Sequence, residues 1–156
     1  MKKLFALMIL SLAMAGWSFS ADKHEHKVIP GPLGGKIFEM EPLHVEFFVN
    51  KDRKVVVAFY DDKMKPVKAG SQIVSSVAEA KSGKATLAFE KSGDVFLSKS
   101  ALPDGNKYRV ILQIKPTAEA KQQNFRLDFD SDICGECKRA EYACKCDGHQ
   151  EGGHKH

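Results

Sequence analysis

The sequence predicts an all-β domain: a small immunoglobulin-like antiparallel β-sandwich followed by a Cys/His-rich C-terminal tail. Two observations lead to this prediction. Short β-rich runs alternate apolar with polar residues, and turn-forming residues separate these runs at short intervals between residues 36 and 130. All four cysteines of the chain come after that region, from Cys134 to Cys146. We therefore expect a sandwich domain over residues 36–130 and a metal-binding tail over residues 131–156.

The first 20 residues have the pattern of a secretory signal peptide. A basic start at Lys2 and Lys3 precedes an apolar run, and small residues place the expected cleavage between Ser20 and Ala21. An uncleaved anchor is the alternative, but the run of about 14 apolar residues is shorter than the roughly 20 that span a bilayer. We expect a periplasmic or secreted mature protein with no membrane span.

Residues 21–35 are expected to be flexible. This segment carries His24 and His26 and then Pro30-Gly31-Pro32 with Gly34-Gly35, and its Pro and Gly content works against regular structure.

The strands of the sandwich are predicted from their alternation. It is strongest over residues 43–49, 108–114 and 125–130, where one face is apolar and the other polar. Two more strands are expected at 54–60 and 71–77, with weaker ones near 36–40, 85–89 and 95–98. Seven or eight strands in about 95 residues are typical of a two-sheet sandwich. The stretch 117–123 follows Pro116 and is interpreted as a crossover turn.

The spacing of the cysteines points to a metal site. Cys134 and Cys137 form a CxxC motif, in which we expect Gly135 to allow the tight turn, and Cys144 and Cys146 form a CxC motif. The first spacing converges two sulfurs on one point, and the second puts two sulfurs on one face of an extended segment. Soft thiolates select zinc or Cu(I) over hard cations.

Two other interpretations of the cysteines stay open. An oxidising compartment favours two structural disulfides, for which four cysteines permit three pairings. A thiol-redox function is the third possibility, although the CxxC motif does not follow a strand in a βαβ pattern.

The histidines are weaker candidate ligands. Five of them occupy the polar ends of the chain, where His-rich tracts can capture metal ions: His24, His26, His149, His154 and His156. His44 is predicted on the polar face of its strand, as a surface residue.

Charge and motifs exclude several function classes. Lys and Arg number 24 against 20 Asp and Glu, a formal charge of +4 that falls to +2 when Lys2 and Lys3 leave with the leader. This small excess does not indicate a nucleic-acid partner. No nucleophile-base arrangement or carboxylate pair has a recognisable context, so we expect no enzymatic activity.

The segments 31–39, 44–49 and 55–62 resemble a small exported β-sandwich domain of bacterial heavy-metal efflux systems. It is similar to the domain found alone or ahead of the adaptor subunit of RND-type exporters. Those domains usually open with Gly-Pro-His-Gly-Gly, whereas this chain has Leu33 in place of the His; His44 matches a later His of the pattern. The resemblance implies a periplasmic accessory of metal resistance, whose partner is an efflux adaptor or another envelope protein.

Overall fold

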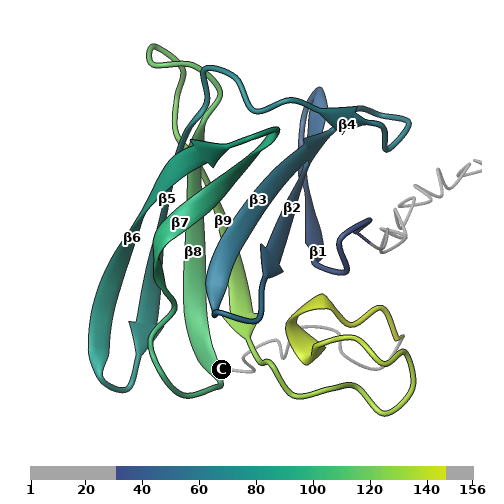
Figure 1. Ribbon diagram of the computed structural model, residues 1–156, viewed down its shortest axis with the longest axis vertical. Helices are drawn as coiled ribbons and strands as arrows, with labels where there is room; N and C mark the ends of the chain where they lie inside the picture. The colour runs from purple at the N-terminus through teal and green to yellow at the C-terminus, as the bar shows by residue number, and fades with distance from the viewer. Residues whose placement is uncertain (1–30, 147–156) are drawn as a thin grey trace, which may run out of the picture.

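The structure is a computed structural model that describes residues 31–146 (Figure 1). Within that range it consists of antiparallel strands and one short 3-10 helix. The elements are β1 (Lys36–Met40), β2 (Leu43–Val49), β3 (Lys54–Tyr60), β4 (Pro66–Val67), β5 (Ile73–Ala80), β6 (Gly83–Ser92), β7 (Val95–Ala101), β8 (Tyr108–Lys115), β9 (Gln123–Phe129) and η1 (Glu141–Ala143). Over residues 31–146 no helix has the length and apolar character needed to cross a membrane.

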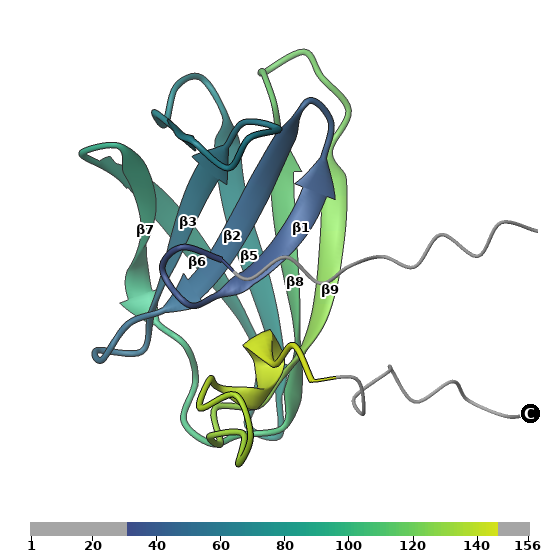
Figure 2. The same ribbon diagram turned by 90° about the vertical axis from the view of Figure 1, so that its right-hand side faces the viewer.

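The strands form one continuous sheet that curls almost into a closed barrel. Their order is β1-β2-β3-β7-β6-β5-β8-β9, and the two-residue β4 pairs with β3. Strand β6 connects the two halves of the sheet, because it pairs with β5 up to Ala88 and with β7 from Phe89 onward. The gap in the barrel lies between β1 and β9 (Figure 2), where the rings of Phe38 and Phe125 meet with their centroids 5.2 Å apart.

The predicted fold class is confirmed: the domain is all-β and antiparallel, with the cysteines gathered at its C-terminal end. The expected two separate sheets are joined through β6. The prediction of a crossover at 117–123 was wrong, because β8 and β9 are neighbours in one hairpin. Strand β4 was not predicted, because it has only two residues and Pro66, one of them, is typical of a turn.

The interior of the barrel is a single apolar core. The alternating residues of β2, β3, β8 and β9 face inward, as their patterns predicted. The largest fully buried apolar side chains are Phe47, Phe59, Phe129, Leu87, Leu112, Ile114, Val45, Val55, Val57 and Val110.

Glu46 departs from its predicted place in solvent. It alternates with the core residues Val45 and Phe47 and so lies on the outer wall, yet it is fully buried because the Gly31–Gly35 loop covers it. The carboxylate accepts hydrogen bonds from Leu33 N at 3.0 Å and from Gly35 N at 2.7 Å.

Tyr60 completes the shell around this carboxylate. Its hydroxyl donates to Glu46 Oε2 at 2.7 Å. Burial, together with this hydrogen bond to a carboxylate, raises the pKa of Tyr60 well above its usual range. Glu46 therefore joins the loop to β2 and β3. Its hydrogen bonds compensate the free-energy cost of burying a carboxyl group.

Replacing Gly35 by Ala tests this close approach of loop and strand. An added Cβ would lie 2.2 Å from the carbonyl oxygen of Phe47, and backbone cannot move aside cheaply. Gly35→Ala should lower the free energy of unfolding by about 3 kcal/mol or more. Urea denaturation followed by circular dichroism, with reductant and chelator present, measures it.

Gly135→Ala is the matched control, because nothing lies within 4 Å of its added Cβ. Its stability should stay within about 0.5 kcal/mol of the parent protein. Equal stability of the two variants would contradict the packing of the Gly31–Gly35 loop described above.

Candidate metal centre

The C-terminal segment, residues 131–146, folds back on itself at the end of the barrel. Cys134 N donates to Arg139 O at 2.8 Å and Lys138 N to Cys134 O at 3.1 Å, which closes a tight turn. Ile133 and Ala140 pair as an antiparallel bridge beside it. The turn presents the first two cysteines, and η1 then leads into the second two.

Asn106 connects the start of this segment to the barrel. Its side-chain amide donates to Asp130 Oδ1 at 2.8 Å, and its carbonyl oxygen accepts from Ser131 N at 2.7 Å. The backbone of Asp130 also accepts from Tyr142 N at 2.9 Å. Both ends of the segment are thus bonded to the end of β9.

Tyr142 anchors the segment in the core. Its side chain is only 7% exposed and packs edge-on against Phe47 and stacked on Phe129, with centroids 5.9 and 5.4 Å away. Its hydroxyl oxygen accepts a hydrogen bond from Val49 N at 3.0 Å. Residues 131–146, expected as a tail beyond the domain, therefore share its hydrophobic core through Tyr142 and Ala143.

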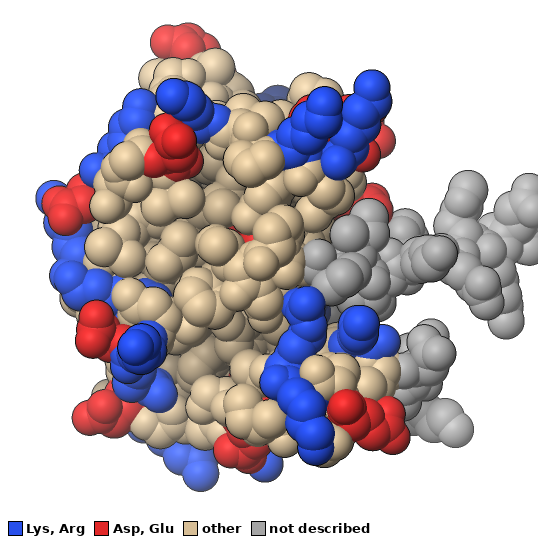
Figure 3. Space-filling view, turned by 45° about the vertical axis from the view of Figure 1, so that its right-hand side comes forward, with Lys and Arg blue, Asp and Glu red and all other residues tan. Residues whose placement is uncertain are grey.

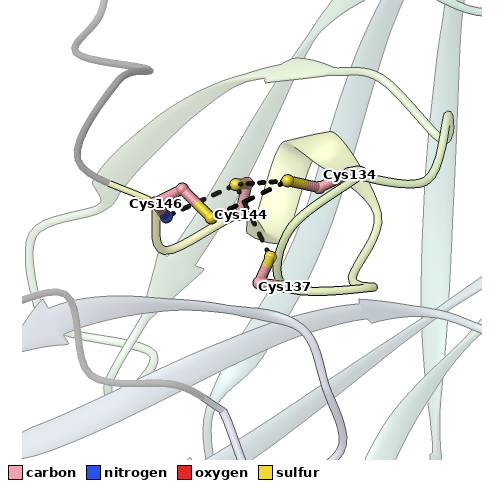
Figure 4. Close-up of side chains that lie close together, drawn as sticks. All are labelled: Cys134, Cys137, Cys144 and Cys146. Atoms are coloured by element: carbon pink, nitrogen blue, oxygen red, sulfur yellow. Dashed lines mark hydrogen bonds between the residues drawn. The ribbon is translucent and has the colours of Figure 1, made fainter.

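The four cysteine sulfurs converge on one point (Figure 4). All of them lie within 4.8 Å of one another. Cys144 Sγ lies 3.3 Å from Cys134 Sγ and 3.6 Å from Cys137 Sγ, and Cys134 Sγ lies 3.8 Å from Cys146 Sγ. Zinc bonded to four sulfurs at about 2.3 Å needs them about 3.8 Å apart, so these distances fit a tetrahedral site.

The backbone of the CxxC turn differs from the expectation. The residue in the left-handed region is Lys138, with φ of 57°, and Gly135 does not have a positive φ. The tight turn is therefore closed at Lys138 rather than made possible by glycine at position 135. This backbone leaves three of the cysteines, Cys137, Cys144 and Cys146, partly accessible, while Cys134 is buried.

The surroundings of the thiols shift their pKa values in different directions. Backbone N–H groups of Lys145 and Arg139 lower the pKa of Cys137 to about 6, which favours its thiolate. A hydrogen bond with Glu136 raises the pKa of Cys146.

At Cys144 opposing effects meet. The backbone N–H of Cys146 favours the thiolate of Cys144, but burial and the neighbouring thiols outweigh it and raise the pKa. One thiol of the group therefore loses its proton readily, and the negative charge then disfavours deprotonation of the others. A bound cation would favour deprotonation of all of them.

Of the candidate histidine ligands the structure describes only His44, which does not belong to the cysteine group. His44 lies on β2, paired with Glu39 and Tyr60, and is partly buried on the outer wall. Its Nδ1 is buried and has no hydrogen-bond partner among the described residues. The other five lie outside the described residues: His24, His26, His149, His154 and His156.

Sequence reasoning missed the residues that position the cysteines. Tyr142 sits between the two cysteine pairs in a charged, turn-rich stretch, where a single aromatic residue was the available signal of a buried anchor. Asn106 ends a run of turn-forming residues, Pro103-Asp104-Gly105-Asn106, which indicates a turn but not this role. The described residues contain one group of three or more potential ligands, the four cysteines.

Tyr142 variants test whether the segment is anchored as described. Tyr142→Phe keeps the ring but deprives Val49 N of its acceptor, and should cost about 1–3 kcal/mol of unfolding free energy. Tyr142→Ala also removes the stacking and should cost about 3–5 kcal/mol. Urea denaturation of the reduced, metal-free protein measures both. A Tyr142→Ala variant as stable as the parent would show that the segment does not dock.

No family model, curated sequence or solved structure matches the chain. The resemblance to domains of metal exporters therefore rests on the three short segments named above.

Proposed function

We propose that the protein binds one soft metal ion, zinc or Cu(I), and serves as an exported accessory of heavy-metal efflux or resistance. The observation that carries the metal-binding part is the convergence of the sulfurs of Cys134, Cys137, Cys144 and Cys146 within 4.8 Å. Among residues 31–146 no carboxylate or imidazole belongs to this group, and its four described donors are all soft thiols.

The way the site is held supports binding without a large rearrangement. The two cysteine pairs flank the Tyr142 anchor, and hydrogen bonds to the end of β9 fix the same segment. Little conformational freedom remains to be lost when a metal ion binds, which favours affinity. Lys138, Arg139 and Lys145 lie between and beside the ligands and offset the net −2 of four thiolates around a divalent ion.

Transfer of the ion to a partner is supported by the unequal burial of the ligands. Three of the four cysteines are partly accessible at the surface, so donor groups of a partner can replace them one at a time. In this proposal the partner is an RND-type efflux adaptor or another envelope protein. Reversible transfer of an ion needs no chemical step, which agrees with a binding protein rather than an enzyme.

Export is supported by the sequence of residues 1–20, which lie outside the described residues. A periplasmic or secreted location also raises the alternative function. There, the same close approach of sulfurs allows two disulfides, and the domain would then act as an envelope interaction module with stapled cysteines.

Elemental analysis paired with thiol counting separates these functions. The mature protein is isolated without chelator from the periplasm of a bacterial expression host, and both measurements are made on one sample. We expect about one metal ion per chain and four thiols that react after the metal is removed without reductant. The double variant Cys134→Ser/Cys137→Ser should lose the metal ion, because two thiolates alone bind far more weakly.

Ser131→Ala is the control, since it alters the same segment without touching a sulfur. A parent protein with no metal and no free thiol would establish the disulfide alternative. Metal content that survives the double variant would refute this placement of the site. A precursor that keeps residues 1–20 and stays in the cytoplasm would refute export without touching the metal site.

A further inference from the structure

A cleft lies where the C-terminal segment meets the end of the barrel. Its volume is about 390 Å³, within the range of small-molecule sites. Its walls come from Gly34, the end of β2, the turn that carries Arg53, the end of β9, and six residues between Ser131 and Tyr142. In Figure 3, Lys and Arg side chains lie where the C-terminal segment adjoins the barrel, with acidic side chains next to them.

The charged groups along this cleft are all positive. Arg53, Lys138 and Arg139 line it, and no aspartate or glutamate does. Lys138 Nζ donates to Gly135 O at 2.6 Å. Arg139 Nη1 and Arg53 Nε are buried and have no hydrogen-bond partner among the described residues. Buried donors without acceptors are uncommon and costly, so the protein itself leaves part of both guanidinium groups unsatisfied.

One of these cations is held in place before any ligand arrives. Arg53 Nη2 donates to Gly105 O at 3.0 Å and to Tyr108 Oη at 3.2 Å, and the guanidinium lies 5.7 Å from the centre of the Phe129 ring. A preorganised guanidinium binds an anion at a smaller entropic cost than a mobile one. Guanidinium groups match the geometry of carboxylate and phosphate oxygens.

The rest of the cleft is apolar. Phe48, Phe129 and Tyr142 contribute aromatic surface, and Ile133, which is 65% exposed, forms part of the wall. An inorganic ion would leave this surface unused, whereas a molecule with an apolar body would cover it.

We propose that this cleft binds a small organic anion, with its carboxylate or phosphate group against Arg139 and Arg53 and its apolar body against Phe48 and Ile133. The cleft is separate from the sulfur group and does not depend on a metal ion. Lys138 and Arg139 belong to the turn that begins at Cys134, so an occupied cleft also holds that turn against the barrel.

The test is a titration of the ¹⁵N-labelled, reduced protein followed by NMR. The probes are benzoate and phenyl phosphate, with benzyl alcohol as a neutral analogue and inorganic phosphate as an anion without an apolar body. We expect saturable shifts of the Ser131, Ile133 and Ala140 amides with the two organic anions. Benzyl alcohol and inorganic phosphate should bind at least about tenfold more weakly, since each lacks one of the two contacts.

Two pairs of variants locate the site. Arg139→Gln should weaken benzoate binding about tenfold, whereas Arg126→Gln, which removes an exposed charge on β9, should leave it unchanged. Ile133→Glu places a carboxylate on an exposed wall position and should abolish binding, while Ile133→Gln should not. The second pair keeps the test decisive if Arg139→Gln fails to fold.

Equal shifts with benzyl alcohol and benzoate, or unchanged benzoate affinity in both Arg139→Gln and Ile133→Glu, would overturn the proposal. Repeating the titration with and without added zinc, and with and without added Cu(I) under anaerobic conditions, separates it from the proposed metal function. Anion binding in a protein that takes up neither ion would refute only the metal site, and metal uptake without anion binding would refute only the cleft.

Discussion

The burial of Tyr142 fixes the position of residues 131–146, and the cysteine group depends on it. Its ring fills the space beside Phe47 and Phe129 at the end of the barrel, and its hydroxyl satisfies the backbone of Val49. Cys144 and Cys146 follow Tyr142 by two and four positions, so fixing the ring also restricts the second cysteine pair. The thiol group is consequently part of the folded domain rather than a mobile appendage.

This attachment explains two features that lie side by side. The sulfurs keep nearly tetrahedral spacing because Asn106 Oδ1 accepts a hydrogen bond from Ser131 N and Asp130 O accepts one from Tyr142 N, which fixes the segment on both sides of the first cysteine pair. The same docking leaves a cleft between segment and barrel, which Lys138, Arg139 and Tyr142 line from the side of the segment. Metal binding and anion binding would then act on one structural unit, each favouring its docked form.

The fold was largely predictable because burial imposes period-two alternation, and β1, β2 and β3 begin and end as predicted. The barrel-like closure was not predictable from the sequence. It depends on β6 pairing with β5 over its first part and with β7 over its second. The cysteine group was predictable from spacing, which is local. Tyr142 and Glu46 were missed because their burial depends on distant partners: Tyr142 contacts β2 across more than 90 residues, and a preceding loop covers Glu46.

The central claim is that four cysteine thiolates hold one metal ion, and X-ray absorption at the edge of the bound metal tests it most directly. The account predicts a first shell of about four sulfur atoms, at about 2.3 Å if the ion is zinc. A first shell made mainly of nitrogen or oxygen would contradict it, because the ligands would then lie outside the group formed by Cys134, Cys137, Cys144 and Cys146.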